Sequence, residues 1–129
     1  MFEITAYKPS IYINLENGIY LFDNMSATGK TRLCRLLKNC QAYREPVAAY
    51  TYNDKLIGLP IEKVLEPGKY KVILLDRYDM YEGDGKELIN ECAKQSIILI
   101  DCKGKFTVTN EEELCTISLK EDKIEVDLA

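Results

Sequence analysis

Three consecutive residues, Gly29, Lys30 and Thr31, have the types and the spacing that bind a nucleoside triphosphate. A glycine lets backbone N–H groups approach a phosphate, a lysine ammonium neutralises the β- and γ-phosphates, and a threonine hydroxyl is a ligand for Mg²⁺. This segment therefore predicts ATP with Mg²⁺ as the cofactor. The residues expected to contact the nucleotide are Asn24, Met25, Ser26, Ala27, Thr28, Gly29, Lys30, Thr31 and Arg32.

The elements on either side of this segment favour the same prediction. An apolar strand is expected over residues 18–22, and a helix over 30–40 has an apolar stripe that includes Leu33 and Leu37. A loop between such a strand and helix places an anion at the helix N-terminus, where the helix dipole and the free N–H groups stabilise it.

The match to the motif G-x-x-x-x-G-K-S/T is incomplete, because Asn24 stands at its first glycine position and Ala27 at a position that is glycine in many such loops. Asparagine adopts left-handed backbone conformations more readily than most residues, so the loop can still form. Asp23, however, would bring a carboxylate close to the phosphates. The alternative is a turn that caps helix 30–40 and binds no ligand.

Two aspartates follow apolar runs that are typical of strands buried on both faces. Asp76 ends the run 71–75, and Asp101 ends the run 97–100. Mg²⁺ prefers oxygen ligands, and a strand-end carboxylate beside a triphosphate can supply one. We therefore expect Asp76 and Thr31 to bind the metal and Asp101 to lie near the γ-phosphate, although strand-end aspartates also cap turns.

Composition restricts the other functions. The net charge of −4 without a basic cluster argues against nucleic acid as the main ligand, and the absence of histidine excludes histidine-based catalysis. The five cysteines show no C-x-x-C spacing, which favours a reducing compartment. No apolar stretch is long enough to span a membrane. The sequence predicts a cytoplasmic protein without a membrane segment.

The order of expected elements indicates the fold. Hairpins are expected around residues 8–10 and 17–18, buried strands over 47–52, 71–76 and 97–101, and short strands over 106–109, 114–119 and 124–128. We therefore predict one domain, residues 1–129, with an α/β fold: a three-layer sandwich with a mainly parallel central sheet and added antiparallel N- and C-terminal strands.

With the phosphate-binding segment and the two acidic strands together, the chain resembles the P-loop NTPase superfamily, and within it the ABC/AAA-like ATPases. The resemblance lies in the layout: strand 18–22 enters residues 26–33, an acidic strand follows, and residues 115–124 form a closing hairpin. It implies a reduced or degenerate ATPase domain, because the helical subdomain and an LSGGQ-like signature are absent.

The resemblance also affects the expected chemistry. ATPases of this type have a glutamate directly after the strand-end aspartate, and this chain has Arg77 there. Asp79 or Glu82 could orient the attacking water instead, so the candidate catalytic residues are Asp76 and Asp79. Arg77 could contact phosphate or form an ion pair with Asp79 or Glu82. The expected activity is a weak or partner-dependent ATPase.

Two alternatives remain open at this stage. Arg44-Glu45-Pro46 and Asp76-Arg77-Tyr78 follow the phosphate-binding segment in the order found in thymidylate kinase-like enzymes, which implies a nucleotide kinase with Arg77 on a phosphate. The other alternative is a non-catalytic interaction module, for which the nine tyrosines could supply a surface for a protein partner or a second copy of the chain.

Overall fold

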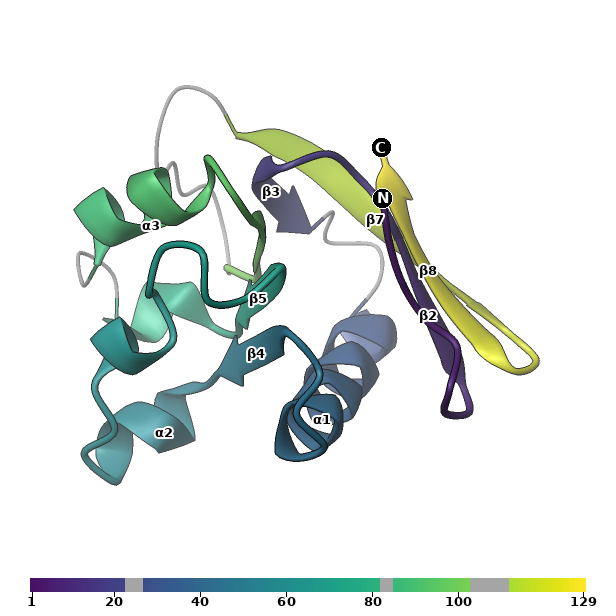
Figure 1. The fold of residues 1–129 in the computed structure, drawn as a ribbon, viewed down its shortest axis with the longest axis horizontal. Helices are drawn as coiled ribbons and strands as arrows, with labels where there is room; N and C mark the ends of the chain where they lie inside the picture. The colour runs from purple at the N-terminus through teal and green to yellow at the C-terminus, as the bar shows by residue number, and fades with distance from the viewer. Residues whose placement is uncertain (23–26, 82–84, 103–111) are drawn as a thin grey trace.

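The computed structural model describes residues 1–22, 27–81, 85–102 and 112–129. They form one sheet of eight strands in the order β1-β2-β8-β7-β3-β6-β5-β4, together with three α-helices and two short 3₁₀ helices (Figure 1). The elements in chain order are β1 (Phe2–Ile4), β2 (Ser10–Asn14), β3 (Gly18–Phe22), α1 (Ala27–Ala42), β4 (Val47–Tyr50), α2 (Tyr52–Leu56), η2 (Ile61–Lys63), β5 (Val72–Leu75), η3 (Tyr78–Tyr81), α3 (Lys86–Cys92), β6 (Ile97–Ile100), β7 (Glu113–Lys120) and β8 (Lys123–Leu128).

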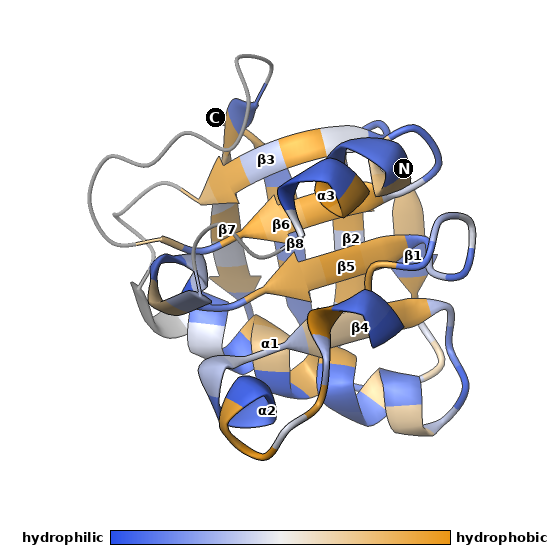
Figure 2. Ribbon diagram, turned by 90° about the vertical axis from the view of Figure 1, so that its left-hand side faces the viewer, coloured by the Kyte–Doolittle hydropathy of each residue, from blue (hydrophilic) through white to orange (hydrophobic). Residues whose placement is uncertain are grey.

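Five neighbouring strands, β7, β3, β6, β5 and β4, are mutually parallel. Every residue of β4, β5 and β6 is buried, as expected for strands covered on both faces. Figure 2 shows the apolar arrows of β3, β6, β5 and β4 pointing in the same direction. The carboxyl ends of these strands therefore lie along one edge of the sheet.

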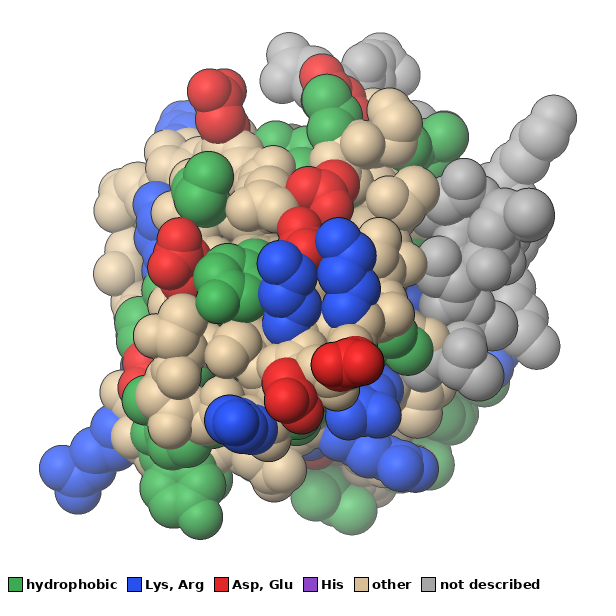
Figure 3. Space-filling model, turned by 90° about the vertical axis from the view of Figure 1, so that its right-hand side faces the viewer, with side chains coloured by type: hydrophobic (Ala, Val, Ile, Leu, Met, Phe, Trp, Pro, Cys, Tyr) green, Lys and Arg blue, Asp and Glu red, His purple; other side chains and the backbone are tan. Residues whose placement is uncertain are grey.

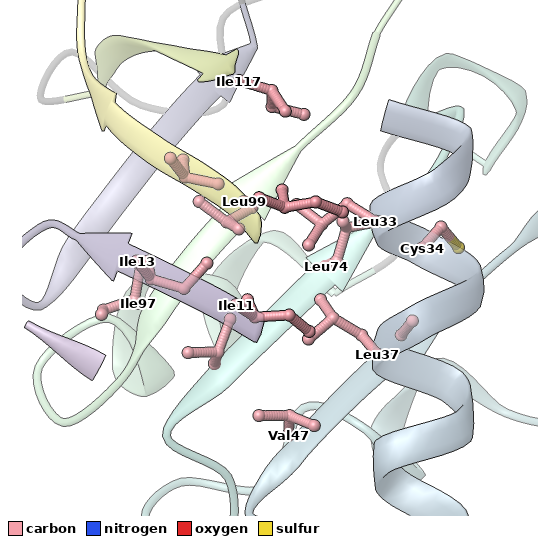
Figure 4. Packing of buried hydrophobic residues seen from close by; sticks show 14 of the residues in the cluster. Ile11, Ile13, Leu33, Cys34, Leu37, Val47, Leu74, Ile97, Leu99 and Ile117 are labelled. Carbon is pink, nitrogen blue, oxygen red and sulfur yellow. The ribbon is translucent and has the colours of Figure 1, made fainter. Parts of the chain in front are cut away.

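Helix α1 fills the hollow of the curled sheet. Leu33 and Leu37 are fully buried and point from α1 toward the strands (Figure 4). Their cluster includes Leu74 of β5 and also Ile11 of β2 and Val126 of β8, which lie far away in the strand order. The same helix is thus covered by both ends of the sheet.

The opposite face of the parallel strands has its own apolar cluster. Ile73 and Ile98 contribute to it from the sheet, and Ile89 and Cys92 from α3. Tyr78 and Tyr81 of η3 complete it, with their rings edge to face at 5.3 Å. Both faces of β4, β5 and β6 are therefore closed to water.

The strands β7, β8 and β2 have one buried and one polar face. In β8, Ile124 and Val126 are buried, and the intervening Glu125 pairs with Lys123 at 2.8 Å. Figure 3 shows the side of the molecule to the right of Figure 1, where Lys and Arg side chains lie beside Asp and Glu side chains. This alternation keeps the apolar face of the curl toward α1.

The predicted three-layer sandwich with a mainly parallel central sheet is wrong, because the sheet is mixed and curls into a half-barrel around α1. The expected pairing across residues 17–18 is also wrong: β2 pairs in parallel with β8, not with β3. The apolar faces of β2, β7 and β8 explain the curl, since they are buried only by wrapping around the helix. Residues 106–109 lie outside the described residues.

Several local predictions hold. The hairpins β1–β2 and β7–β8 are antiparallel, and the helix expected over 30–40 is present as α1, with longer bounds. None of the helices in the four described ranges is long and apolar enough to cross a membrane.

Candidate functional site

The two strand-end aspartates are neighbours in space. Strands β5 and β6 pair in register, and the ladder continues beyond them, because the Asp101 N–H donates to the Leu75 carbonyl at 2.9 Å. The Asp76 N–H donates to the Tyr50 carbonyl of β4, also at 2.9 Å. Both acids therefore lie on the same edge of the sheet, at the carboxyl ends of adjacent parallel strands.

Lys30 reaches these acids from the first turn of α1. Its ammonium nitrogen lies 2.9 Å from an Asp101 carboxylate oxygen, and each side chain is only 12% exposed. An ion pair with so little solvent contact is less screened than a surface pair. No acidic residue occupies the first turn of α1, so Lys30 and the helix N-terminus together make this end of the helix positive.

The Asp76 side chain lies close enough to that of Asp101 for the two carboxyl groups to interact. Burial raises the pKa of Asp76 to about 6, and the neighbouring Asp101 acts in the same direction. Arg77 and Lys30 oppose this rise. The site therefore has two neighbouring carboxyl groups with two cations, Lys30 and Arg77, close to them.

Arg77 adopts a left-handed conformation, with φ at 54°, directly after Asp76. The Tyr78 N–H donates to the Asp101 carbonyl at 2.8 Å, and the Tyr81 hydroxyl donates to the Asp76 carbonyl at 2.7 Å. These bonds hold the chain in a sharp turn at the end of β5. A non-glycine residue with this conformation is uncommon and is found disproportionately at functional sites.

Asp79, the second candidate catalytic residue, forms an ion pair with Arg77 at 3.4 Å. The Arg77 side chain is 37% exposed and that of Asp79 is 23% exposed. The pairing that the sequence left open for Arg77 is therefore present. This ion pair engages the Asp79 carboxylate, which could otherwise orient a water molecule.

The residues around the expected loop are only partly described. Residues 23–26, with Asn24, Met25 and Ser26, and Glu82 lie outside the described residues. Ala27 and Thr28 begin α1, and Thr31 and Arg32 are exposed on its first turns.

Gly29 has a packing role that the sequence did not reveal. A Cβ atom at this position would lie 2.9 Å from Cγ2 of Ile117 in β7, closer than real contacts allow. The glycine therefore lets the start of α1 approach the sheet closely. A helix–sheet contact is thus one physical reason for this glycine, independent of any phosphate.

The acids of the site could hold Mg²⁺ only with help from other ligands. Within the described ranges, no group of three or more histidine, cysteine, aspartate or glutamate side chains is placed to hold a metal ion. Mg²⁺ usually keeps several waters and binds through one or two carboxylates plus substrate phosphates. Asp76, with Asp101 beside it, fits that mode of binding and does not fit a metal site built entirely from protein ligands.

The two segments that resemble thymidylate kinases lie at opposite edges of the sheet. Asp76-Arg77-Tyr78 follows the carboxyl end of β5, whereas Arg44-Glu45-Pro46 precedes the amino end of β4. The Pro46 carbonyl accepts from the Lys71 N–H just before β5, and β4 and β5 are parallel. The two arginines therefore do not converge on one ligand.

A cavity of about 490 Å³ lies away from the acid pair. It is lined by Gly18 at the amino end of β3, by Lys94 beyond α3 and by Glu113 at the start of β7. Its lysine pairs with Glu91 at 3.1 Å. The ion pair of Lys30 with Asp101 and the neighbouring Asp76 lie at the other edge of the sheet, so we place the candidate site there.

The sequence did not reveal that Lys30 pairs with Asp101 and that Asp101 contacts Asp76. The only sequence signal for this contact was the repeated pattern of an apolar strand followed by an acid. The sequence patterns did not show the strand order, in which β6 lies between β3 and β5 and brings Asp101 close to the start of α1.

Comparison with known proteins adds no assignment, because no family model, no curated protein and no solved structure matches the chain.

Proposed function

We propose that the chain binds ATP with Mg²⁺ at the carboxyl ends of β3, β5 and β6. One observation carries the proposal: Lys30, in the first turn of α1, meets the strand-end acids Asp101 and Asp76 in a largely buried cluster. A polyphosphate needs a cation and free backbone N–H groups, and its metal needs carboxylate oxygen. The cluster offers all three at one place.

The position of the cluster in the sheet supports the same function. The chain leaves β3 through α1, which packs on one face, and enters β6 from α3, which packs on the other. In the strand order, β6 lies directly beside β3, so the start of α1 and the acid after β6 are at neighbouring strand ends. Ligands of parallel sheets bind outside the carboxyl ends of the strands.

Each residue has a defined role in this proposal. Lys30 exchanges the Asp101 carboxylate for a phosphate oxygen, and the N-terminus of α1 donates N–H groups to the phosphates. Asp76 and Thr31 hold Mg²⁺, and water and phosphate oxygens complete its coordination. Bound ATP supplies a phosphoryl group that water can accept.

The chain's own contribution to hydrolysis is small in this proposal. Arg77 directly follows Asp76, and Asp79 is engaged with Arg77 at 3.4 Å, so neither is placed as a free general base. The ATPase activity is therefore weak, or depends on a protein partner or a second copy of the chain that supplies the missing group.

No specific observation favours the kinase alternative, because Arg44 and Arg77 lie at opposite edges of the sheet. The non-catalytic interaction module is the alternative against which the proposal is tested.

A thermal-shift measurement with ATP and MgCl₂ tests the proposal. Saturating ligand should raise the melting temperature of the wild type, because a ligand that binds only the folded state stabilises it. The shift should vanish in Lys30→Ala and persist in Arg35→Ala, a charge change at an exposed position on the same helix. If the wild type shows no shift, the chain is an interaction module.

A further inference from the structure

A second cavity, of about 220 Å³, lies beside edge strand β4 and is separate from the acid cluster. Its lining comes from the second half of α1, from β4 and from residues 59–70. Lys38 lines the cavity from α1 and lies about two helical turns beyond Lys30.

The interior of this cavity is apolar and aromatic. Ala49, Tyr50 and Val64 line it and are buried. The half-buried Tyr70 stands at its side, and its hydroxyl oxygen accepts a hydrogen bond from the Gln41 side chain at 3.3 Å. The Tyr50 hydroxyl donates to the Leu59 carbonyl. Both tyrosines are thus fixed by partners, and a flat apolar group can pack against them without first ordering the site.

The remaining lining holds more lysines than acids. Three lysines, Lys38, Lys63 and Lys69, line the cavity together with a single acid, Asp54. Asp54 pairs with Lys38 at 2.7 Å, and Lys69 pairs with Glu66 at 3.2 Å. In the described part of the chain, none of the ion pairs involves Lys63. The lining therefore has a surplus of positive charge.

We propose that this cavity binds a small aromatic phosphate monoester. The ring lies against Tyr70 and the apolar interior, and the dianionic phosphate lies among Lys38, Lys63 and Lys69. Pockets for drug-sized ligands measure about 300–1,000 Å³, so the volume here suits a single ring with its phosphate. Several lysines match a dianion better than a carboxylate with one charge.

A simpler explanation gives these lysines a different purpose. Charged side chains beside an edge strand discourage its pairing with other chains, and β4 is such a strand. That explanation requires exposed charge but no saturable site. Binding therefore distinguishes the two.

The experiment is a titration of the ¹⁵N-labelled chain with phenyl phosphate, followed by amide chemical shifts. We expect saturable shifts at Ala49, Val64 and Tyr70. Inorganic phosphate, which lacks the ring, and phenol, which lacks the charge, should each bind at least about tenfold more weakly, a free-energy difference of about 1.4 kcal/mol.

Matched variants localise the binding. Lys63→Gln with Lys69→Gln should weaken phenyl phosphate binding by at least about tenfold. Lys94→Gln with Lys123→Gln removes the same charge from exposed ion pairs elsewhere and should leave the affinity within about twofold. Lys30→Ala should also leave it unchanged, which separates this cavity from the proposed ATP site.

Three results would overturn the proposal. These are no saturable shift with phenyl phosphate, equal affinity in the Lys63/Lys69 and Lys94/Lys123 double variants, or loss of binding in Lys30→Ala. The last result would mean that the phosphate binds at the acid cluster instead.

Discussion

Lys30 in the first turn of α1 and Asp101 after β6 form an ion pair at 2.9 Å, with each side chain 12% exposed. The pair joins the start of the helix to the edge of the sheet. The Asp101 carboxylate holds the cation that the proposed function assigns to a phosphate. Under the proposed function, Asp101 would therefore compete with ATP for Lys30.

The first prediction follows from this competition. Asp101→Asn removes the negative charge that holds Lys30, so we expect ATP without Mg²⁺ to bind more tightly, by about threefold to tenfold. Titration of ATP in the presence of EDTA measures the effect. The control is Asp127→Asn, a charge change on the polar face of β8. If the Asp101→Asn variant binds ATP no more tightly than the Asp127→Asn variant, Asp101 does not compete with ATP for Lys30.

The second prediction separates metal binding from phosphate binding. Asp76→Asn removes the proposed Mg²⁺ ligand, so it should weaken ATP binding with Mg²⁺ far more than ATP binding without it. Arg77→Ala should change both affinities little, because Arg77 is paired with Asp79. Equal losses with and without Mg²⁺ in Asp76→Asn would remove Asp76 from the metal site.

The third prediction concerns the pH dependence of stability. The pKa of Asp76 is about 6 in the folded chain, above its ordinary value near 3.9 in the unfolded chain. The folded state therefore binds the proton more tightly, and the stability contributed by the protonated form is lost as the pH rises through about 6. Asp76→Asn, which cannot ionise, should gain about 1–3 kcal/mol relative to wild type between pH 4 and pH 7.

Urea unfolding at the two pH values measures this difference. Asp79→Asn is the control, because Asp79 follows the same strand but lies outside the acid pair. A free-energy difference between Asp76→Asn and wild type that does not change with pH would contradict the raised pKa of Asp76.

The fourth prediction tests the packing role of Gly29. A methyl group at this position meets Cγ2 of Ile117 at 2.9 Å, so Gly29→Ala should destabilise the chain by about 1–3 kcal/mol. Adding Ile117→Ala removes the clashing atom, and the two changes should cost less together than the sum of each alone. The free energy of unfolding is measured with urea. Additive losses would show that the contact with Ile117 is not what destabilises the Gly29→Ala variant.

Sequence patterns located the local elements but not their arrangement. The four-residue apolar runs of β5 and β6 and the helical stripe with Leu33 and Leu37 indicated their elements correctly. Burial on both faces of a strand gives a continuous apolar run, and burial of one helix face gives a period of about 3.6 residues. The parallel pairing of β2 with β8 left no such signal. It joins distant segments, and its register depends on how both wrap around α1.

The candidate site shows the same division. The spacing of Gly29, Lys30 and Thr31 and the acids at the strand ends predicted candidate residues, and the structure brings Lys30, Asp76 and Asp101 together. That arrangement depends on strand order, which the local patterns of the sequence do not reveal. The left-handed conformation of Arg77 likewise lies between two residues that are held by other parts of the chain: the Tyr78 N–H donates to the Asp101 carbonyl, and the Asp76 carbonyl accepts from the Tyr81 hydroxyl.

The most direct test of the central claim is calorimetric titration of the wild-type chain with ATP in the presence of Mg²⁺, repeated with Lys30→Ala. We predict saturable binding of one ATP per chain by the wild type and loss of measurable binding in the variant, because Lys30 supplies the buried positive charge of the site. Absence of binding by the wild type, or equal binding by both proteins, would contradict the account.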